Sequence, residues 1–356
     1  MYTFEQLKNF SENVFLKMGC PEDEAALAAE VLVAADIRGI DSHGVARLIG
    51  YVRLWEAGRI NPNPDIKVVY ETPSTATVDG DAGLGLVVAP KAMEIAIEKA
   101  SNVGSGWVSV KNSNHFGIAG QHAAMALAKD MIGMAMTNAS PLVAPTFSTE
   151  RLLGTNPIAV AIPSGQEDPF IADFATTTAA NGKLEILQRK GEDAPIGWIQ
   201  NATGEPTENA HALKDGGALL PLGSDREHGS HKGYCLGSIV DIFSAVLSGA
   251  NYGPWAPPFV SFLPLAKDPV GEGLGHFLGA MRIDAFRPAD EFKEHMDNWL
   301  NRFKTAEAAE DQPKVYIPGD PEREMMAIRA KNGIPVNDKV LADLETLAKK
   351  FDLELE

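Results

Sequence analysis

Cysteine is nearly missing from this chain of 356 residues, which contains only Cys20 and Cys235, far apart in the sequence. Two distant cysteines exclude a framework of disulfide bonds and a zinc site made of thiolates. The sequence therefore fits a protein of the reducing cytoplasm.

Long apolar segments are missing too. No uninterrupted stretch reaches the roughly 20 apolar residues that span a bilayer, and residues 1–8 lack a basic segment followed by an apolar run. We expect neither membrane insertion nor export.

Basic residues are outnumbered, with 31 Lys and Arg against 48 Asp and Glu and a formal net charge of -17. Because clustered lysine and arginine hold a phosphate backbone, we expect neither nucleic acid nor an anionic membrane as a partner. The chain is 45% hydrophobic, which at this length is enough for a core of two packed lobes.

The apolar pattern alternates between helix and strand spacing and predicts an α/β fold. Helices are expected twice within 3–33, from Ser42 to a stop at 61–64, and over 90–100, 234–248, 290–304 and 320–332. Strands are expected over 75–78, 106–110, 133–137, 158–162, 170–173 and 277–283. The predicted architecture has helical N- and C-terminal segments that pack together around an inserted, strand-rich middle.

The segment from Asp36 to Tyr51 carries the clearest chemistry. Ser42 is a candidate helix cap, and His43, Arg47 and Tyr51 stand at four-residue steps on one face of that helix. A histidine moves protons near neutral pH, an arginine binds a carboxylate with two hydrogen bonds, and a helix N-terminus disfavours a charged histidine. These groups suit an acid whose neighbouring carbon is oxidised or reduced, although a capped surface helix explains the segment equally well.

A second histidine, His115, follows a predicted strand within the run Asn112-Ser113-Asn114-His115-Phe116-Gly117. Catalytic groups gather at strand ends in α/β proteins, so His115 is a second candidate proton carrier or a donor to a substrate carbonyl. The alternative is that Asn114 and His115 only satisfy the backbone of a turn.

Two familiar motifs fail on inspection. The glycine-rich run 79–88 has Val88 at the third glycine position of a Rossmann fingerprint, so a tight turn is the better interpretation. His228 and His231 form an H-x-x-H pair without a further ligand at helical spacing, so we expect no metal site.

Several predicted loops offer hydroxyls, backbone donors and a carboxylate, the groups that bind a ribose and a pyrophosphate. They contain Ser140, Thr155, Asp173 and the pair Lys232-Gly233. Each loop taken singly is explained by turn chemistry.

Six ordered motifs resemble one known family. The runs D-I-R-G-I-D-S-H-G-V-A-R-L, N-S-N-H-F-G, G-T-N-P, D-F-A-T-T, H-K-G-Y-C-L and V-Y-I-P-G-D look like the type-2 malate/L-lactate dehydrogenases, which include sulfolactate and ureidoglycolate enzymes. The resemblance implies an NAD(P)-dependent homodimer whose dinucleotide-binding fold is not of the Rossmann type, with sites near the subunit boundary.

Site residues follow from this resemblance one by one. It implies that His43 is the proton donor or acceptor, Ser42 its hydrogen-bonded neighbour, Arg47 the clamp on the substrate carboxylate and His115 a second active-site histidine; Tyr51 is added as a pocket residue by the helical spacing. The expected cofactor contacts are Gly120, Ser140, Thr155, Asp173, Phe174, Ala175, Lys232, Gly233, Pro318 and Gly319.

Two departures from the family pattern stand out. The segment 181–183 lacks the acidic residue that some relatives place in a relay with serine and histidine. Asp320 stands where the family has glutamate or glutamine, which leaves a contact between Asp320 and a ribose in doubt.

We therefore expect residues 1–120 with 285–356 to form a substrate and dimerisation domain, and residues 121–284 to form an inserted NAD(P)-binding domain. The expected reaction is hydride transfer between NAD(P)H, with a slight preference for NAD, and a small 2-keto or 2-hydroxy acid such as malate or lactate. The loop 251–265, with Trp255, Pro257, Pro258 and Phe259, is expected to wall the substrate pocket. A non-catalytic dinucleotide sensor and a metal-dependent hydrolase are the alternatives.

Overall fold

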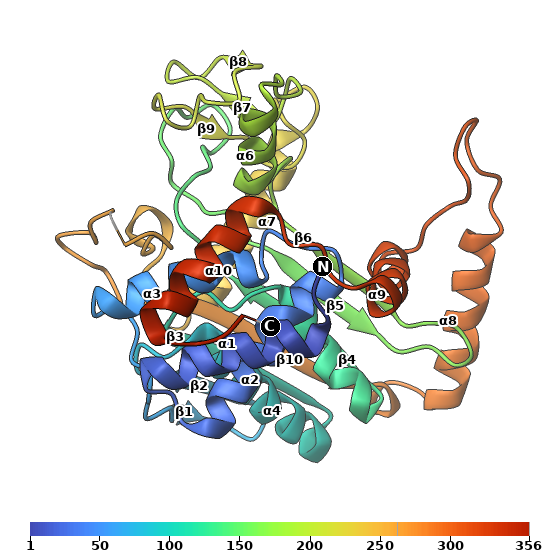
Figure 1. The fold of residues 1–356 in the computed structure, drawn as a ribbon. Coiled ribbons are helices and arrows are strands. Elements are labelled where there is room, and N and C mark those ends of the chain that lie inside the picture. Colours follow the sequence, from blue (N-terminus) through green and yellow to red (C-terminus); the bar gives the residue numbers. More distant parts are fainter. Residues whose placement is uncertain (262, 356) are drawn as a thin grey trace.

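A single mixed sheet of seven strands runs through the centre of the computed structural model, which describes residues 1–261 and 263–355 (Figure 1). In spatial order the strands are β1 (Lys67–Glu71), β2 (Thr75–Asp79), β3 (Ser105–Ser113), β10 (Leu274–Arg282), β4 (Met131–Thr137), β5 (Ile158–Ile162) and β6 (Phe170–Phe174). Only β2 and β3 run parallel; every other neighbouring pair in this sheet is antiparallel. The strand predictions are confirmed, and the late strand β10 lies between β3 and β4.

Helices cover both faces of this sheet. Small and apolar side chains of α4 (Gly85–Val103) and α5 (Ala119–Ala124) share a buried core with one face of the strands. On the other face Val240 of α7 (Ser230–Asp241) packs with Met136, Ile158 and Phe277. The helix expected over 234–248 is therefore α7 followed by the π-helical turn η3 (Ile242–Val246).

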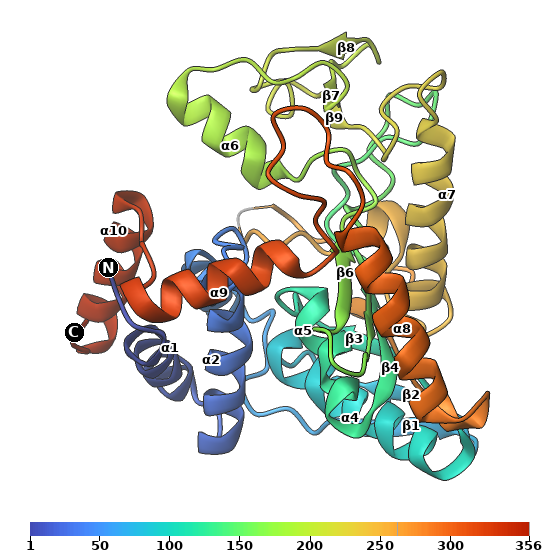
Figure 2. The ribbon, with the colours of Figure 1, turned by 90° about the vertical axis from the view of Figure 1, so that its right-hand side faces the viewer.

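The two ends of the chain pack against each other. α1 (Phe4–Met18), α2 (Glu22–Ile37), α3 (Leu48–Glu56) and α10 (Asp338–Phe351) share one core. α1 begins with a capping box between Thr3 and Gln6. Tyr2 and Ile334 form a short antiparallel bridge, and both termini lie close together in Figures 1 and 2.

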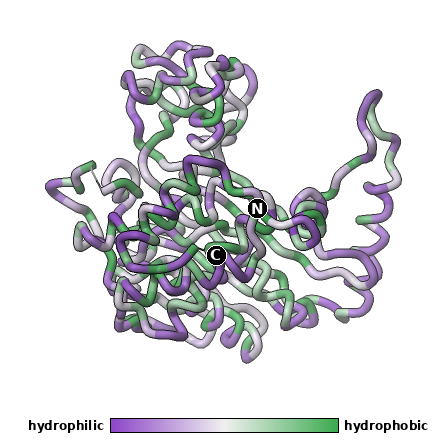
Figure 3. The backbone as a smooth tube through the Cα atoms, viewed as in Figure 1, coloured by the Kyte–Doolittle hydropathy of each residue, from purple (hydrophilic) through white to green (hydrophobic). Residues whose placement is uncertain are grey.

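Two parts stand away from this body. One is a lobe made of α6 (Asn181–Lys190) and the small strands β7 (Ile199–Gln200), β8 (Pro206–Thr207) and β9 (Ala218–Leu219), which has a core of its own. The other is an arm formed by α8 (Ala289–Lys304) and the loop leading to α9 (Asp320–Asn332); much of it is hydrophilic (Figure 3). In the described residues, no helix has both the length and the apolar character that crossing a bilayer demands.

The helix expected to open at Ser42 begins later than predicted. Residues 41–44 form a turn, a short 3-10 helix η1 spans Val45–Arg47, and α3 starts at Leu48. The prediction of a serine cap is wrong because the Ser42 hydroxyl bonds to the His43 ring, while the carboxylate of Asp36 accepts the hydrogen bond of the Val45 N–H at 2.9 Å.

The proposed division at residue 120 passes through one sheet, since β3 and β10 are hydrogen-bonded neighbours. One continuous sheet therefore contains strands of both expected domains. The division into these domains stays a prediction.

Candidate active site

Two histidines from distant segments face each other at the centre of the site. His43 lies on the turn before η1, and His115 follows β3. Their rings are stacked with centroids 5.7 Å apart and an interplanar angle of 26°. The structure therefore brings together the two candidate proton carriers.

His43 is held by its neighbour Ser42, whose Oγ lies 2.8 Å from His43 Nδ1. That bond uses one ring nitrogen and leaves Nε2 for a substrate. Burial and, second, the charge of Arg47 lower the pKa of His43 to about 4. The sequence suggested that a helix dipole disfavours the charged form of His43. Because His43 lies before the helix, burial and Arg47 account for its low pKa instead.

His115 is oriented by Tyr51, whose Oη lies 2.6 Å from His115 Nδ1. The Gly117 N–H also donates to this Nδ1, at 3.3 Å, so Nδ1 is an acceptor and the ring proton belongs on Nε2. Burial, followed by nearby cationic and histidine groups, holds the pKa of His115 well below its usual value. His115 is thus a neutral donor, and Tyr51 lies fully buried behind it.

The backbone at His115 is fixed by Asn114. The Asn114 side chain donates to the carbonyl groups of Ala82 and Gly83, at 2.9 and 3.0 Å. These carbonyls belong to the glycine-rich run, which is a turn closed by a bond from the Gly83 N–H to the Gly80 carbonyl. The turn interpretation is confirmed, and its function in the fold is to support the histidine segment.

Arg47 completes the cluster. Its Nε donates to the Ser42 carbonyl at 2.5 Å. Within residues 1–261 and 263–355 its two terminal nitrogens make no hydrogen bond or ion pair, so they can bind a carboxylate with two bonds. The Arg47 charge lowers the pKa of both His43 and His115, which means that all three groups share one site.

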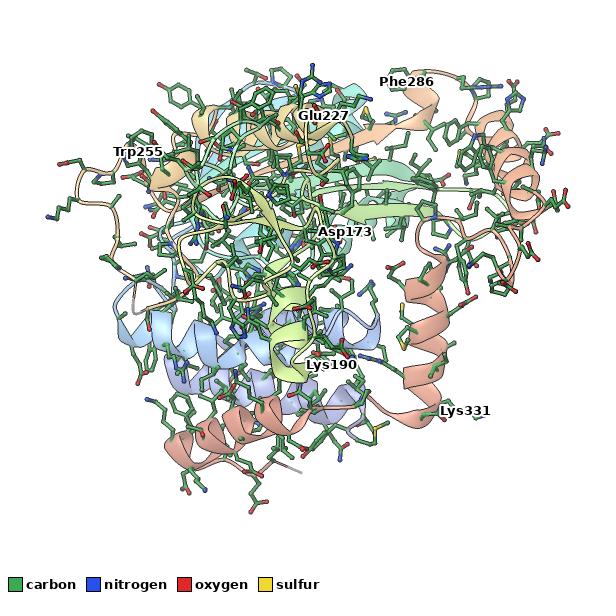
Figure 4. The ribbon with its side chains drawn as sticks, turned by 90° about the horizontal axis from the view of Figure 1, so that it is seen from above. Asp173, Lys190, Glu227, Trp255, Phe286 and Lys331 are labelled. Carbon is green, nitrogen blue, oxygen red and sulfur yellow. The ribbon has the colours of Figure 1, made fainter. Side chains whose placement is uncertain are left out.

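The loop expected as a pocket wall reaches this cluster through Phe259. The Phe259 ring centroid lies 4.7 Å from that of His115 and 5.0 Å from that of Tyr51. Its N–H donates to Ser140 Oγ at 3.0 Å. Arg59 binds the same loop, donating to the Leu263 carbonyl at 2.6 Å. Trp255, which is labelled in Figure 4, is partly exposed.

A second group of candidate residues lines a cavity of about 500 Å³. Its walls include Arg38, Gly120, Asp173, Pro318, Gly319 and Glu322. The Gly120 N–H donates to Asp173 Oδ2 at 2.7 Å, and a Cβ on Gly120 would lie 2.9 Å from that oxygen. Asp173 is near the middle of the molecule in Figure 4, and the surrounding protein desolvates its carboxyl and raises the pKa to about 6.

This cavity has the size of a small-molecule site. Small-molecule sites commonly measure about 300–1,000 Å³, and a carboxylate beside open space is a natural acceptor for ribose hydroxyls. A glycine at position 120 keeps that space open next to Asp173. The cavity volume, the Asp173 carboxylate and the space beside Gly120 therefore suit a small ligand that carries hydroxyl groups.

A third group surrounds the start of α7. Gly233 packs against the backbone of Leu222, whose N–H donates to the Thr176 carbonyl at 2.9 Å, and the Thr176 N–H donates to the Thr155 carbonyl at 2.9 Å. Lys232 is exposed beside Gly233. The run Asp173-Phe174-Ala175-Thr176 connects this third group with the cavity.

Comparison with known proteins identifies the family, because a family model described as malate/L-lactate dehydrogenase matches residues 2–345. The chain belongs to the malate/L-lactate dehydrogenase family. It is 45% identical over 351 residues to a malate dehydrogenase of Pyrococcus abyssi, covering 98% of this chain and 94% of that protein. It is 38% identical over 353 residues to an L-sulfolactate dehydrogenase of Methanocaldococcus jannaschii, covering 99% and 97%.

Solved structures agree. The malate dehydrogenase from Pyrococcus horikoshii OT3 superposes with a TM-score of 0.90 at 39% identity, over 99% of this chain and 96% of that one. The mixed α/β fold with a central sheet is therefore confirmed. The protein is a 2-hydroxyacid dehydrogenase, and its relatives imply a nicotinamide cofactor.

The structure shows the hydrogen-bond partners of three residues that the sequence singled out in this dehydrogenase: Asp320, His228 and His231. Asp320 Oδ2 accepts from the Ile317 N–H at 2.9 Å and its Oδ1 pairs with Arg323 at 2.6 Å, so its carboxylate holds the Pro318–Gly319 turn. His228 bonds to Asp225 and His231 to Arg226. Across the described parts of the chain, no group of three or more His, Cys, Asp or Glu side chains is placed to hold a metal ion.

Three further residues were not predicted from the sequence: Arg38 and Glu322, which line the cavity, and the buried Asp36. A signal for two of them was present, since Asp36 and Arg38 belong to the same motif as His43. Asp36 in particular is a carboxylate at the end of a helix that is otherwise rich in alanine and valine.

Proposed function

We propose that this dehydrogenase transfers a hydride between a nicotinamide dinucleotide and a small 2-hydroxy or 2-keto acid of the malate or lactate type. The observation that carries the proposal is the cluster itself: two stacked histidine rings beside a guanidinium whose terminal nitrogens are free to bind a carboxylate. The printed names of its relatives, malate and sulfolactate dehydrogenase, support this substrate class.

In the oxidation direction the roles follow from the protonation states. Arg47 binds the substrate carboxylate and orients the adjacent carbon. Neutral His43 accepts the proton of the hydroxyl group, and the Nε2–H of His115 donates a hydrogen bond to the same oxygen. A nicotinamide dinucleotide, when bound, would supply the hydride acceptor for the carbon that Arg47 orients.

The substrate also adjusts the base. The Arg47 charge is the second cause of the low pKa of His43. A carboxylate bound to Arg47 compensates this charge, so the pKa of His43 rises toward neutrality when substrate is present. Acid–base catalysis is most efficient when the pKa lies near the working pH.

For the cofactor we propose NAD over NADP, held by the cavity around Gly120, Asp173, Pro318 and Gly319. Arg38 and Arg323 line the cavity together with Asp173 and Glu322, so the preference rests on the hydrogen bonds that the Asp173 carboxylate can accept from ribose hydroxyls and not on net charge. Further proposed contacts are Ser140, Thr155, Phe174, Ala175, Lys232 and Gly233. A mostly antiparallel sheet supports a dinucleotide fold that is not of the Rossmann type.

We also propose a homodimer in the cytoplasm. Large apolar side chains are exposed along α7 and η3, among them Ile239 at 43%, Ile242 at 50%, Val246 at 50% and Leu247 at 60%. A stripe of this kind is typical of a surface that a second subunit covers. The two free cysteines support a reducing compartment.

The test is the absorbance of NADH and NADPH during incubation with oxaloacetate, pyruvate and sulfopyruvate. We expect steady oxidation of NADH with at least one of these acids and indifference to chelators. Dinucleotide binding without turnover would favour the sensor, and loss of activity with a chelator would favour a metal-dependent enzyme.

A further inference from the structure

A buried carboxylate lies directly beneath the turn that carries His43. Asp36, in the last turn of α2, has only 3% of its surface exposed. Its Oδ2 accepts the hydrogen bond of the Val45 N–H at 2.9 Å, across nine residues of sequence. The first backbone donor of η1 is thus satisfied by the side chain of another helix.

Gly44 rests on the same carboxylate. A Cβ added at Gly44 would collide with all three atoms of the Asp36 carboxyl group. Gly44 and Val45, the two residues after His43, are therefore both in contact with one side chain. Ser42 provides no competing cap, because its hydroxyl bonds to the His43 ring.

A second side chain fixes the other end of the turn. Arg329 of α9, which is 8% exposed, donates to the Asp36 carbonyl and pairs with the carboxylate of Asp41. Its Nη2 lies 3.1 Å from Asp41 Oδ2. The turn is therefore held between α2 and α9, with Asp36 as the residue common to both contacts.

We propose that Asp36 is a positioning residue: its carboxylate holds the Gly44–Val45 backbone and thereby sets the place of the His43 ring in the site. The expected effect of Asp36 on turnover rests on the proposed function of His43. The expected effect of Asp36 on the position of the His43 ring does not depend on that function.

The charge of Asp36 strengthens the contact. An ionised carboxylate is a better acceptor than a neutral one. The charged groups that face it are Arg329 of α9 and Asp41 of the turn. Burial raises the pKa of Asp36 to about 7, whereas that of His43 is lowered to about 4. A step in activity near neutral pH in the free enzyme is therefore expected to follow Asp36, with activity falling as the pH decreases.

The experiment compares Asp36→Ala, Asp36→Asn and the control Glu24→Gln in the full-length enzyme. Glu24 is a second carboxylate of α2 with 7% exposure, and it pairs with Lys91, away from the turn. Two quantities are measured from about pH 5 to pH 9: kcat and KM, and the NMR signal of the His43 ring in protein with ¹³C-labelled histidine. The variant His43→Gln identifies that signal.

We expect Asp36→Ala to move the His43 signal and to lower kcat by roughly 10- to 100-fold, the effect of a small displacement of a reacting group. Asp36→Asn keeps an acceptor of the same shape, so kcat should stay within about fivefold of the wild type. The step near neutral pH in kcat/KM, which reports the free enzyme, should disappear in this variant. Glu24→Gln should leave both quantities unchanged.

If Asp36→Ala does not fold, Gly44→Ala provides the same test, because its methyl group displaces the Asp36 carboxylate. The double variant Gly44→Ala/Asp36→Ser should then recover part of the lost kcat. An unmoved His43 signal in Asp36→Ala, or an unchanged pH step in Asp36→Asn, would overturn the inference. A moved signal with unchanged kcat would support the placement by Asp36 and contradict instead the proposed catalytic role of His43.

Discussion

The histidine cluster and the Asp173 cavity are built in opposite ways. In the cluster the polar atoms bond mainly to one another, through Ser42 to His43, Tyr51 to His115 and Arg47 to Ser42. The cavity draws its walls from four separate parts of the chain, 38–40, 118–120, 169–173 and 316–326, and encloses about 500 Å³. The cluster has a fixed geometry that suits the proton transfer we propose for it, whereas the cavity leaves open space for a ligand.

Removal of the imidazole of His43 is the strongest way to separate the two regions. We expect His43→Ala to lower kcat by roughly two to four powers of ten, because a positioned acid or base contributes this much. Dinucleotide affinity, measured by quenching of protein fluorescence, should stay nearly constant because the cavity is untouched. A variant that retained most of its turnover would transfer the proton step to His115.

The contrast between the two regions also explains what the sequence could predict. The cluster comes largely from one short motif, so the sequence already brought His43, Arg47 and Tyr51 together. The cap at Ser42 was wrong, and so was the single helical face, because His43 lies on a turn, Arg47 ends η1 and only Tyr51 lies within α3. The cap failed because the acceptor, Asp36, lies on another helix, and no local rule places it there. Six of the seven strands of the central sheet were predicted from alternation, whereas β1, which is exposed along its whole length, was not. The insertion of β10 between β3 and β4 depends on pairing between residues far apart in sequence.

The cavity was less accessible to sequence reasoning. Gly120, Pro318 and Gly319 were expected to bind cofactor from the family resemblance, and Asp173 also because its loop offers a carboxylate. Only the folded chain brings the four residues to one cavity. Arg38 was missed because its neighbours in the motif belong to the cluster while its side chain lines the cavity. A polar residue inside a motif can therefore serve the adjacent site.

Arg47 tests the substrate side of the cluster. Arg47→Lys keeps the charge but loses the two parallel hydrogen bonds, so we expect the substrate KM to rise roughly 10- to 100-fold with a smaller change in kcat. Steady-state kinetics with a 2-keto acid and with a ketone that lacks the carboxylate provide the measurement. An equal effect on both substrates would show that Arg47 does not bind the carboxylate.

Gly120 tests the cavity. In Gly120→Ala the new methyl group would lie 2.9 Å from Asp173 Oδ2 and narrow the space beside it. We expect the dinucleotide Kd to rise by about tenfold, an effect of roughly 1.4 kcal/mol, with kcat at saturation unchanged. Gly165→Ala is the matched control, because its Cβ would also meet an aspartate, Asp297 Oδ2 at 2.5 Å, in another part of the molecule. Equal losses in the two variants would argue against a cofactor site at Gly120.

The smallest expected effect concerns stability against acid. His276 and His122 are fully buried near the cluster, and burial lowers their pKa values to about 3 and 4. Above pH 6.5 these rings are neutral in the folded and the unfolded chain; below it the unfolded chain binds protons that the folded chain does not. Stability is therefore lost as the pH falls from about 6.5 to 4, with the melting temperature dropping by about 2 °C per kcal/mol.

The cavity does not add to that loss. Desolvation by the surrounding protein raises the pKa of Asp173 to about 6, and a folded chain that binds a proton more readily than the unfolded chain gains stability as the pH falls. We therefore expect the slope of melting temperature against pH to flatten in His276→Gln and to steepen in Asp173→Asn. An unchanged slope in His276→Gln would show that the buried histidines do not cause the loss.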